Sequence, residues 1–327
     1  MTQEHLTARA LPPLPLVAWE DTKETLHRYC QIAGKVRMRL SPFRNHWWHV
    51  TLYVTTRGLS TGPIPYGPYG SATFDISFDL LENKLAVTTS DKGEFSFTLD
   101  DLPVAQFYRR LFDGLRPLGI DAAINTKPFG LDDEYTLDEN TFHCVCKREY
   151  VRRYHRVLLW VDRVFKEFSG RFAGKTSPVQ LYWHSFDLAV TRFSDKQVSL
   201  PEGTDPVTRE AYSHEVISFG FWPGDANVRE PAFYSYTAPE PEGLTEHPLS
   251  PEGARWLPEG GTALLTYEEV RNSSSPAKTL LEFMESTYRA GAKSAGWDIE
   301  ALRTHPRLGK RRSSGEVING EHRQAAV

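Results

Sequence analysis

Two ionisable side chains interrupt an apolar strand pattern in the C-terminal half of the chain. Alternating residues of a strand share one face of a sheet, and one such set is His184, Phe186, Leu188, Val190 and Arg192. Glu215 opens a similar apolar set on the next predicted strand. In an antiparallel hairpin the end of one strand lies beside the start of the next, so we expect Glu215 to lie near Arg192.

The sequence leaves two interpretations of Arg192 and Glu215. One is a structural ion pair, because a half-buried charge requires a partner. The other is a ligand cleft in which the Arg192 guanidinium binds a carboxylate or phosphate, and Glu215 orients it or acts as a base. His184 is the second catalytic candidate, but on one continuous strand it would lie roughly 25 Å from Arg192, at ~3.3 Å per residue. A lone histidine on an apolar face is typically a satisfied core residue.

Aromatic residues beside Pro/Gly turns are candidates for the wall of such a cleft. Trp222 lies in "GFWPGD", and Tyr234 and Tyr236 lie in "FYSYTAPEPEG". Aromatic side chains commonly line ligand pockets, although ordinary packing at strand ends explains these three equally well.

A second histidine candidate lies in "NHWWHVTLYVTT", which we expect to be a strand over 46–56. His46 and His49 are three positions apart and would point to opposite sides of that strand, so a shared metal ion is not expected. Aromatic packing accounts for the segment, while His49 stays a ligand-binding candidate. We predict no metal site and no cofactor.

Composition argues against several classes of partner. The chain has 327 residues, of which 40% are hydrophobic and 24% charged, and its formal net charge is −4. Nothing in this balance favours nucleic acid or an anionic membrane surface. No signal peptide and no run of about 18 apolar residues is found, so we expect a cytoplasmic protein. Its three cysteines, Cys30, Cys144 and Cys146, indicate no disulfide framework.

Familiar nucleotide and hydrolase motifs are absent from the sequence. It contains no G-x-G-x-x-G after a strand, no complete P-loop and no G-x-S-x-G elbow. The segment "GRFAGKTS" resembles only the end of a P-loop, and it follows a predicted helix instead of preceding one. These classes of enzyme are therefore not indicated.

Hydrophobic periodicity predicts the secondary structure. Helical spacing of apolar residues is found over 21–35, 99–119, 151–168 and 276–292. Strand-like runs cover 46–56, 73–81, 84–88, 94–99, 180–193, 214–222, 232–236 and 262–267. The order helix, strands, helix thus occurs twice.

That order suggests an internal repeat. "SPFRNHWWHVTLYVTT" aligns without a gap with "SPVQLYWHSFDLAVTR", pairing Trp47 with Trp183 and Leu52 with Leu188. We therefore predict an α+β protein made of duplicated helix–antiparallel strands–helix units related by a pseudo-two-fold axis. The predicted divisions are a Pro-rich lead-in (1–20), a first half (21–125), a connector (126–149), a second half (150–297) and a disordered polar tail (298–327).

Several stretches resemble an uncharacterised bacterial family, the domain of unknown function DUF5996. They are "LPPLPLVAWEDTKETLHRYCQIAGKVR", "NHWWHVTLYVTTRGLST", "FDLAVTRFS", "REAYSHEVISFGFWPG" and "AFYSYTAPEPEG". The resemblance reaches to about Trp297 and implies a bacterial, soluble, full-length family domain. It brings no activity and no catalytic residues.

The residues together favour a small-molecule-binding protein with a cleft in the second-half sheet. The ligand would be small and, if it contacts Arg192, anionic; whether the protein is an enzyme is left open. The alternative is a non-catalytic module that mediates dimerisation or protein interaction. The sequence does not indicate the oligomeric state.

Overall fold

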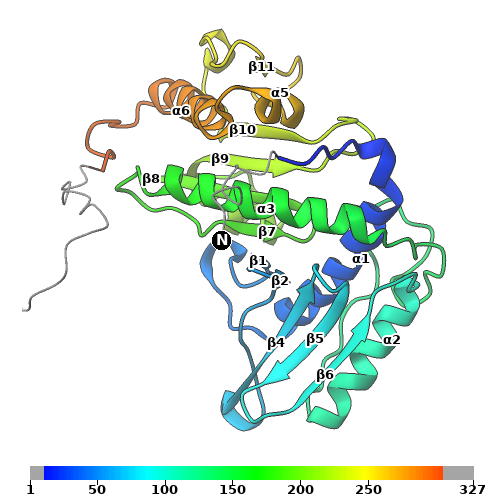
Figure 1. Cartoon of the computed structure of the whole chain (residues 1–327). Helices are drawn as coiled ribbons and strands as arrows, with labels where there is room; N and C mark the ends of the chain where they lie inside the picture. The colour runs from blue at the N-terminus through cyan, green and yellow to red at the C-terminus, as the bar shows by residue number, and fades with distance from the viewer. Residues whose placement is uncertain (1–10, 305–327) are drawn as a thin grey trace, which may run out of the picture.

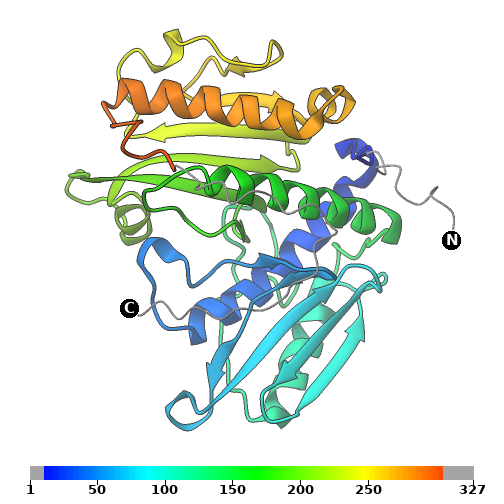
Figure 2. The ribbon, with the colours of Figure 1, turned by 60° about the vertical axis from the view of Figure 1, so that its left-hand side comes forward.

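The fold is α+β, with two antiparallel sheets and helices packed against them. The structure is a computed structural model that describes residues 11–304. Each sheet has six strands, one sheet lying in each half of the chain. Figures 1 and 2 show the two sheets one above the other, with the longest helices between and beside them.

The N-terminal half begins with α1 (Leu16–Leu40) and ends with α2 (Val104–Leu115). Its strands are β1 (Tyr53–Val54), β2 (Gly58–Ser60), β3 (Ile64–Tyr66), β4 (Ala72–Asp79), β5 (Lys84–Thr89) and β6 (Glu94–Thr98). They pair in the order β1-β2-β4-β5-β6, with β3 also on β4.

The C-terminal half runs from α3 (Arg148–Ser169) to α6 (Pro276–Ser294). Its strands are β7 (Gln180–Tyr182), β8 (Asp187–Gln197), β9 (His214–Trp222), β10 (Ala232–Ala238), β11 (Arg255–Trp256) and β12 (Ala263–Thr266), with the short helices α4 (Pro206–Ala211) and α5 (Tyr267–Asn272). The sheet order is β11-β12-β10-β9-β8-β7.

The C-terminal sheet has one face covered by helices. α3 contacts β8, and α6 contacts β9 and β10, so both helices lie on the same side (Figure 2). Leu188, Val190, Ile217 and Phe219 point toward them and are buried. Their neighbours along each strand, such as Asp187 and Ser218, therefore point to the other face. This second face carries the candidate site.

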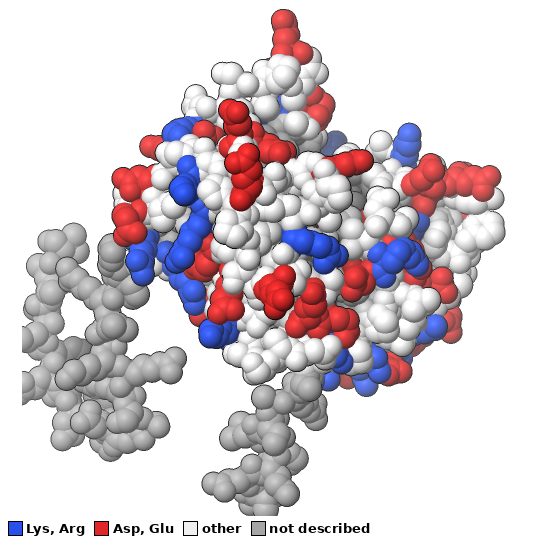
Figure 3. All heavy atoms as spheres, turned by 90° about the horizontal axis from the view of Figure 1, so that it is seen from above, with Lys and Arg blue, Asp and Glu red and all other residues white. Residues whose placement is uncertain are grey.

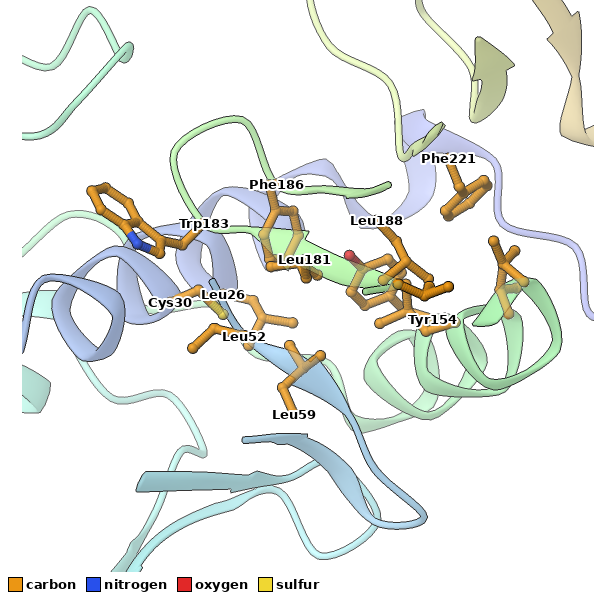
Figure 4. Packing of buried hydrophobic residues seen from close by; sticks show 14 of the residues in the cluster. Leu26, Cys30, Leu52, Leu59, Tyr154, Leu181, Trp183, Phe186, Leu188 and Phe221 are labelled. Carbon is orange, nitrogen blue, oxygen red and sulfur yellow. The ribbon is translucent and has the colours of Figure 1, made fainter. Parts of the chain in front are cut away.

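One continuous hydrophobic core joins the two halves. Leu52 exchanges backbone hydrogen bonds of 2.9 and 2.8 Å with Leu181, which links the two sheets. Figure 4 shows Leu52 close to Cys30 of α1, and Tyr154 of α3 close to Leu188 of β8. The core thus fixes α1 against the C-terminal sheet, although α1 belongs to the other half of the chain.

The strand expected over 46–56 does not form as predicted. Asn45–Trp47 is a 3-10 helix, and His46 and Trp47 have φ angles of 55° and 60°. The His46 backbone N–H donates to Glu210 Oε1 at 2.8 Å, and Trp47 stacks on His49. Tertiary contacts therefore override the alternating pattern, and the strand is limited to Tyr53–Val54.

The strand expected over 180–193 is divided in two. A turn at 183–186, in which Phe186 has a φ of 61°, separates β7 from β8. The turn resets the alternation of faces, so His184 and Arg192 do not share a face as predicted. Several other predicted elements are confirmed, including β5, β9 and α6, while α1 extends beyond both ends of the predicted 21–35 helix. The predicted polar tail lies from residue 305 on outside the described residues.

Candidate functional site

Two adjoining cavities lie on the face of the C-terminal sheet that α3 and α6 do not cover. Their volumes are about 490 and 410 Å³. They share the side chains of Phe129, His184, Ser185, Asp187, Tyr234 and Tyr236. We call the combined space the sheet cleft. A cavity of several hundred Å³ has the size of a typical small-molecule site.

The C-terminal sheet, α1 and the connector before α3 build the sheet cleft. β8, β9 and β10 supply its floor, including Asp187, Trp222 and Tyr234. The opposite wall comes from α1, on which Lys23 and His27 are four residues apart and so share one face of the helix. Phe129, from the connector before α3, closes one side.

Asp187 is the central acidic group of the cleft. It is 6% exposed and accepts hydrogen bonds from the hydroxyl groups of Ser185 and Tyr234. Burial raises the pKa of Tyr234 well above its ordinary value, so its hydroxyl stays protonated and donates. Both donors are neutral, and no ion pair to Asp187 occurs among residues 11–304. The Asp187 charge is thus solvated by hydroxyl groups and has no basic counterpart.

Two parallel tyrosine rings form a wall beside Asp187. The rings of Tyr234 and Tyr236 are 6.1 Å apart with an interplanar angle of 10°, and the hydroxyls of Tyr236 and Tyr212 are 3.1 Å apart. Gly220 is the cross-strand partner of Tyr234. A Cβ atom at Gly220 would lie 2.3 Å from the Tyr234 ring, so only glycine allows this ring to lie flat on the sheet.

The histidines of the cleft are neutral near neutral pH. Burial lowers the pKa of His27 to about 4. Its Nε2 lies 2.9 Å from the Trp183 carbonyl oxygen, and its ring stacks on Phe186. Burial also lowers the pKa of His184, against the opposing effect of the Asp187 charge. Neither histidine therefore supplies the missing positive charge.

Lys23, the one lysine among the described residues of the cleft lining, is already paired. Lys23 Nζ donates to the Gly224 carbonyl at 2.9 Å and lies 2.7 Å from a Glu24 carboxylate oxygen. Burial raises the pKa of Glu24, but Lys23 and Arg28 outweigh it and lower the pKa to about 2. Among the described residues the lining carries three carboxylates, Glu24, Asp187 and Asp225, against one ammonium group, and of the three Glu24 is paired with both Lys23 and Arg28. The cleft therefore favours a cation or a neutral hydrogen-bond donor.

The structure brings four of the sequence-predicted residues together. His184, Trp222, Tyr234 and Tyr236 all line the sheet cleft. His49 lies elsewhere: it stacks on Trp47 at 5.3 Å, and its Nδ1 accepts from the Arg44 backbone at 3.3 Å. His46, three residues before His49, lines the smaller of the two cavities of the sheet cleft, that of about 410 Å³.

Arg192 and Glu215 lie outside the cleft, on the helix-covered side of the sheet, and do not form the expected pair. The cross-strand partner of Arg192 is Ile217. Glu215 accepts hydrogen bonds from Ser194 Oγ at 2.9 Å and Trp297 Nε1 at 2.8 Å. Because Glu215 lies two residues from Ile217, the two positions are diagonal neighbours on one face, as expected. The ion pair does not form, since Ser194, Trp297 and, at 3.7 Å, Lys196 Nζ contact the Glu215 carboxylate.

Sequence reasoning missed Asp187, Lys23, His27 and Phe129. The spacing of Lys23 and His27 marks one face of a helix, but nothing in the sequence indicates that this face meets the sheet of the other half. In the sequence, Asp187 is one position among others of the strand predicted over 180–193. Within residues 11–304, no three His, Cys, Asp or Glu side chains are placed to hold a metal ion.

Comparisons with known proteins identify a family and nothing more specific. No helix within residues 11–304 has the length and apolar character needed to cross a membrane. Neither a curated protein nor a solved structure matches the chain. A family model described as a family of unknown function, DUF5996, matches residues 11–304, and the chain therefore belongs to the DUF5996 family.

Proposed function

We propose that this protein binds a small molecule with an apolar body and a protonated amine in the sheet cleft. The observation that carries the proposal is Asp187, a buried carboxylate hydrogen-bonded by two hydroxyl groups without a basic partner among the described residues. A buried charge is costly unless it is compensated, and an ammonium group on a ligand would compensate it.

The aromatic wall supports the same class of ligand. Tyr234, Tyr236 and Trp222 line the cleft beside Asp187. Aromatic faces attract cations, and the attraction strengthens when water is excluded. The same rings provide an apolar surface for the body of the ligand. An anionic ligand, which the sequence suggested, would instead meet a lining with an excess of carboxylates.

The proposal concerns binding, and a catalytic step would rest on one residue. His184 lines both cavities, and its imidazole has a ring nitrogen that can accept a proton. It would therefore be the general base if the bound amine is chemically transformed. Glu215, the other catalytic candidate, has its carboxylate engaged by Ser194 and Trp297.

Three small ligands that share a phenyl ring and differ in charge test the proposal. Benzylammonium, benzyl alcohol and benzoate share one ring, so their effects on the melting temperature at equal ionic strength isolate the charge. We expect benzylammonium to raise the melting temperature most and benzoate least. Asp187→Asn should remove the preference for the cation, whereas Asp195→Asn, an exposed position on the same strand, should keep it. An equal or larger response to benzoate in the unmodified protein would refute the proposal.

We also propose that the two halves arose by duplication and that the protein is cytoplasmic. Each half runs from a long helix through a six-stranded antiparallel sheet to a closing helix. The opening helix contacts the closing helix in both, α1 with α2 and α3 with α6. The three free cysteines fit a reducing compartment.

A further inference from the structure

A further cavity, separate from the sheet cleft, lies on the opposite, helix-covered side of the C-terminal sheet. It has a volume of about 680 Å³ and lies among the end of α3, the C-terminal part of α6 and residues 299–304. It shares no lining residue with the sheet cleft. We call it the Arg192 cavity, because Arg192 is its only buried cation among the described lining residues.

Arg192 is buried within aromatic rings. Its side chain is 2% exposed, and its Cζ lies 3.5 Å from the ring centroid of Phe168 and 4.3 Å from that of Tyr288. These contacts cover the faces of the guanidinium and leave its edge for hydrogen bonds. Burial lowers the pKa of Arg192 to about 10, so the group is still charged at neutral pH.

The edge of the Arg192 guanidinium has more donors than partners. Nη2 donates to the Phe168 carbonyl oxygen at 2.7 Å, and Nε has no hydrogen-bond partner among residues 11–304. A guanidinium carries five N–H donors, and buried ones are normally satisfied. Glu285, an acidic group of the lining, forms an ion pair with Arg171 at 3.3 Å, and its charge opposes the effect of burial on the pKa of Arg192.

The rim of the cavity is basic. Exposed side chains of Arg171, Arg289, Lys293 and Arg303 surround the opening, with Glu285 and Glu300 as the acidic members. With Arg192 there are five basic groups and two acidic ones, although the whole chain is negatively charged. Viewed from above, several basic side chains lie at the left of the molecule, the side on which α6 ends in Figure 1, with acidic side chains between them (Figure 3).

We propose that the Arg192 cavity binds a phosphate group, either as inorganic phosphate or as a phosphate monoester. Arg192 would bind the phosphate oxygens from the floor, and Arg289 and Lys293 would neutralise the remaining charge from the rim. A planar guanidinium with free edge donors matches tetrahedral oxyanions. Phosphate is favoured over a carboxylate because several cations converge on the site and a dianion can engage more than one of them.

Titration calorimetry with inorganic phosphate and with glycerol phosphate, at constant ionic strength, tests this site. The double variant Arg289→Ala/Lys293→Ala changes only exposed residues and should fold normally. We expect it to weaken phosphate binding about tenfold or more, which corresponds to ~1.4 kcal/mol. Arg110→Ala, an exposed arginine of α2, should bind phosphate like the unmodified protein.

These titrations decide both the proposal and the source of the phosphate. Tighter binding of glycerol phosphate than of inorganic phosphate would assign the site to phosphate esters, and the reverse to the free ion. No phosphate binding in the millimolar range, or equal binding by the rim variant, would overturn the proposal. Asp187→Asn should leave phosphate binding intact, so failure of one site does not decide the other.

Discussion

Asp187 and Arg192 lie on the same strand, β8, yet their side chains point to opposite faces of the sheet. They are separated by an odd number of positions, and side chains alternate along a strand. Each is almost fully buried, at 6% and 2% exposure, and the two charges do not meet. The sheet therefore separates an acidic aromatic cleft from a basic cavity.

Gly220 controls the position of the Tyr234 ring. In Gly220→Ala the new Cβ would lie 2.3 Å from that ring, so Tyr234 must rotate away from Asp187. We expect the melting-temperature response to benzylammonium to fall while the fold is retained. Circular dichroism checks the fold, and Gly170→Ala, at a position with φ of −64° where the nearest atom would lie 3.5 Å from the new Cβ, controls for loss of a glycine. Unchanged binding by Gly220→Ala would show that the Tyr234 ring is not part of the site.

His27 makes the stability of the protein depend on pH. Its pKa is about 4 in the folded protein and 6.5 as the ordinary value, so between these values the unfolded chain takes up a proton that the folded protein does not. The free energy of unfolding is therefore highest above pH 6.5. It falls as the pH drops from 6.5 toward 4, by about 3 kcal/mol in total, because the unfolded chain is protonated first. Urea unfolding across this range should show a shallower pH dependence for His27→Gln. The same slope in both proteins would contradict the assignment.

Gly34 allows α1 to approach the C-terminal half. A Cβ at this position would lie 2.1 Å from Trp183 Cδ1. Alanine is favoured over glycine inside a helix by about 1 kcal/mol, but overpacking costs about 1–3 kcal/mol. Gly34→Ala should therefore lower the free energy of unfolding. In a double-mutant cycle, Trp183→Leu should remove most of this loss, and additive effects would show that the clash is not with the indole.

Glu215 is expected to be structural. Glu215→Ala leaves Ser194 Oγ and Trp297 Nε1 without their acceptor, which should cost about 1–3 kcal/mol of stability. Because the carboxylate lies on the helix-covered side, the affinity for benzylammonium should not change. Denaturation and calorimetry on the same preparation separate the two effects. If Glu215→Ala lowered the affinity for benzylammonium without lowering the stability, Glu215 would be a ligand-binding residue.

Much of the fold could be predicted from sequence periodicity. β9 matches its predicted bounds, and β5 and α6 match them within two residues. Two predicted strands, 46–56 and 180–193, fail where residues adopt positive φ angles: His46 and Trp47 in the first, Phe186 in the second. Such angles are rare outside glycine, and here tertiary contacts stabilise them, so an alternating pattern cannot reveal them. The short elements β2, β3, β11, α4 and α5 are not predicted at all.

The site could be predicted only in part. Trp222, Tyr234 and Tyr236 were found because aromatic residues beside turns suggest a wall. Lys23 and His27 could not be found, because they come from the other half of the chain and meet the sheet only through the shared core. The sequence marks Arg192 as unusual on an apolar face, but the alternation also predicts that it shares this face with His184, and the turn at 183–186 places the two on opposite faces.

Calorimetric titration of benzylammonium into the unmodified protein and into Asp187→Asn tests the central claim most directly. We predict saturable binding to the unmodified protein and a loss of at least about tenfold in affinity for the variant, as expected when a buried charged contact is removed. Benzoate should bind neither protein measurably. Equal affinity of both proteins for benzylammonium, in samples that remain folded by circular dichroism, would contradict the claim that Asp187 is the cation-binding group.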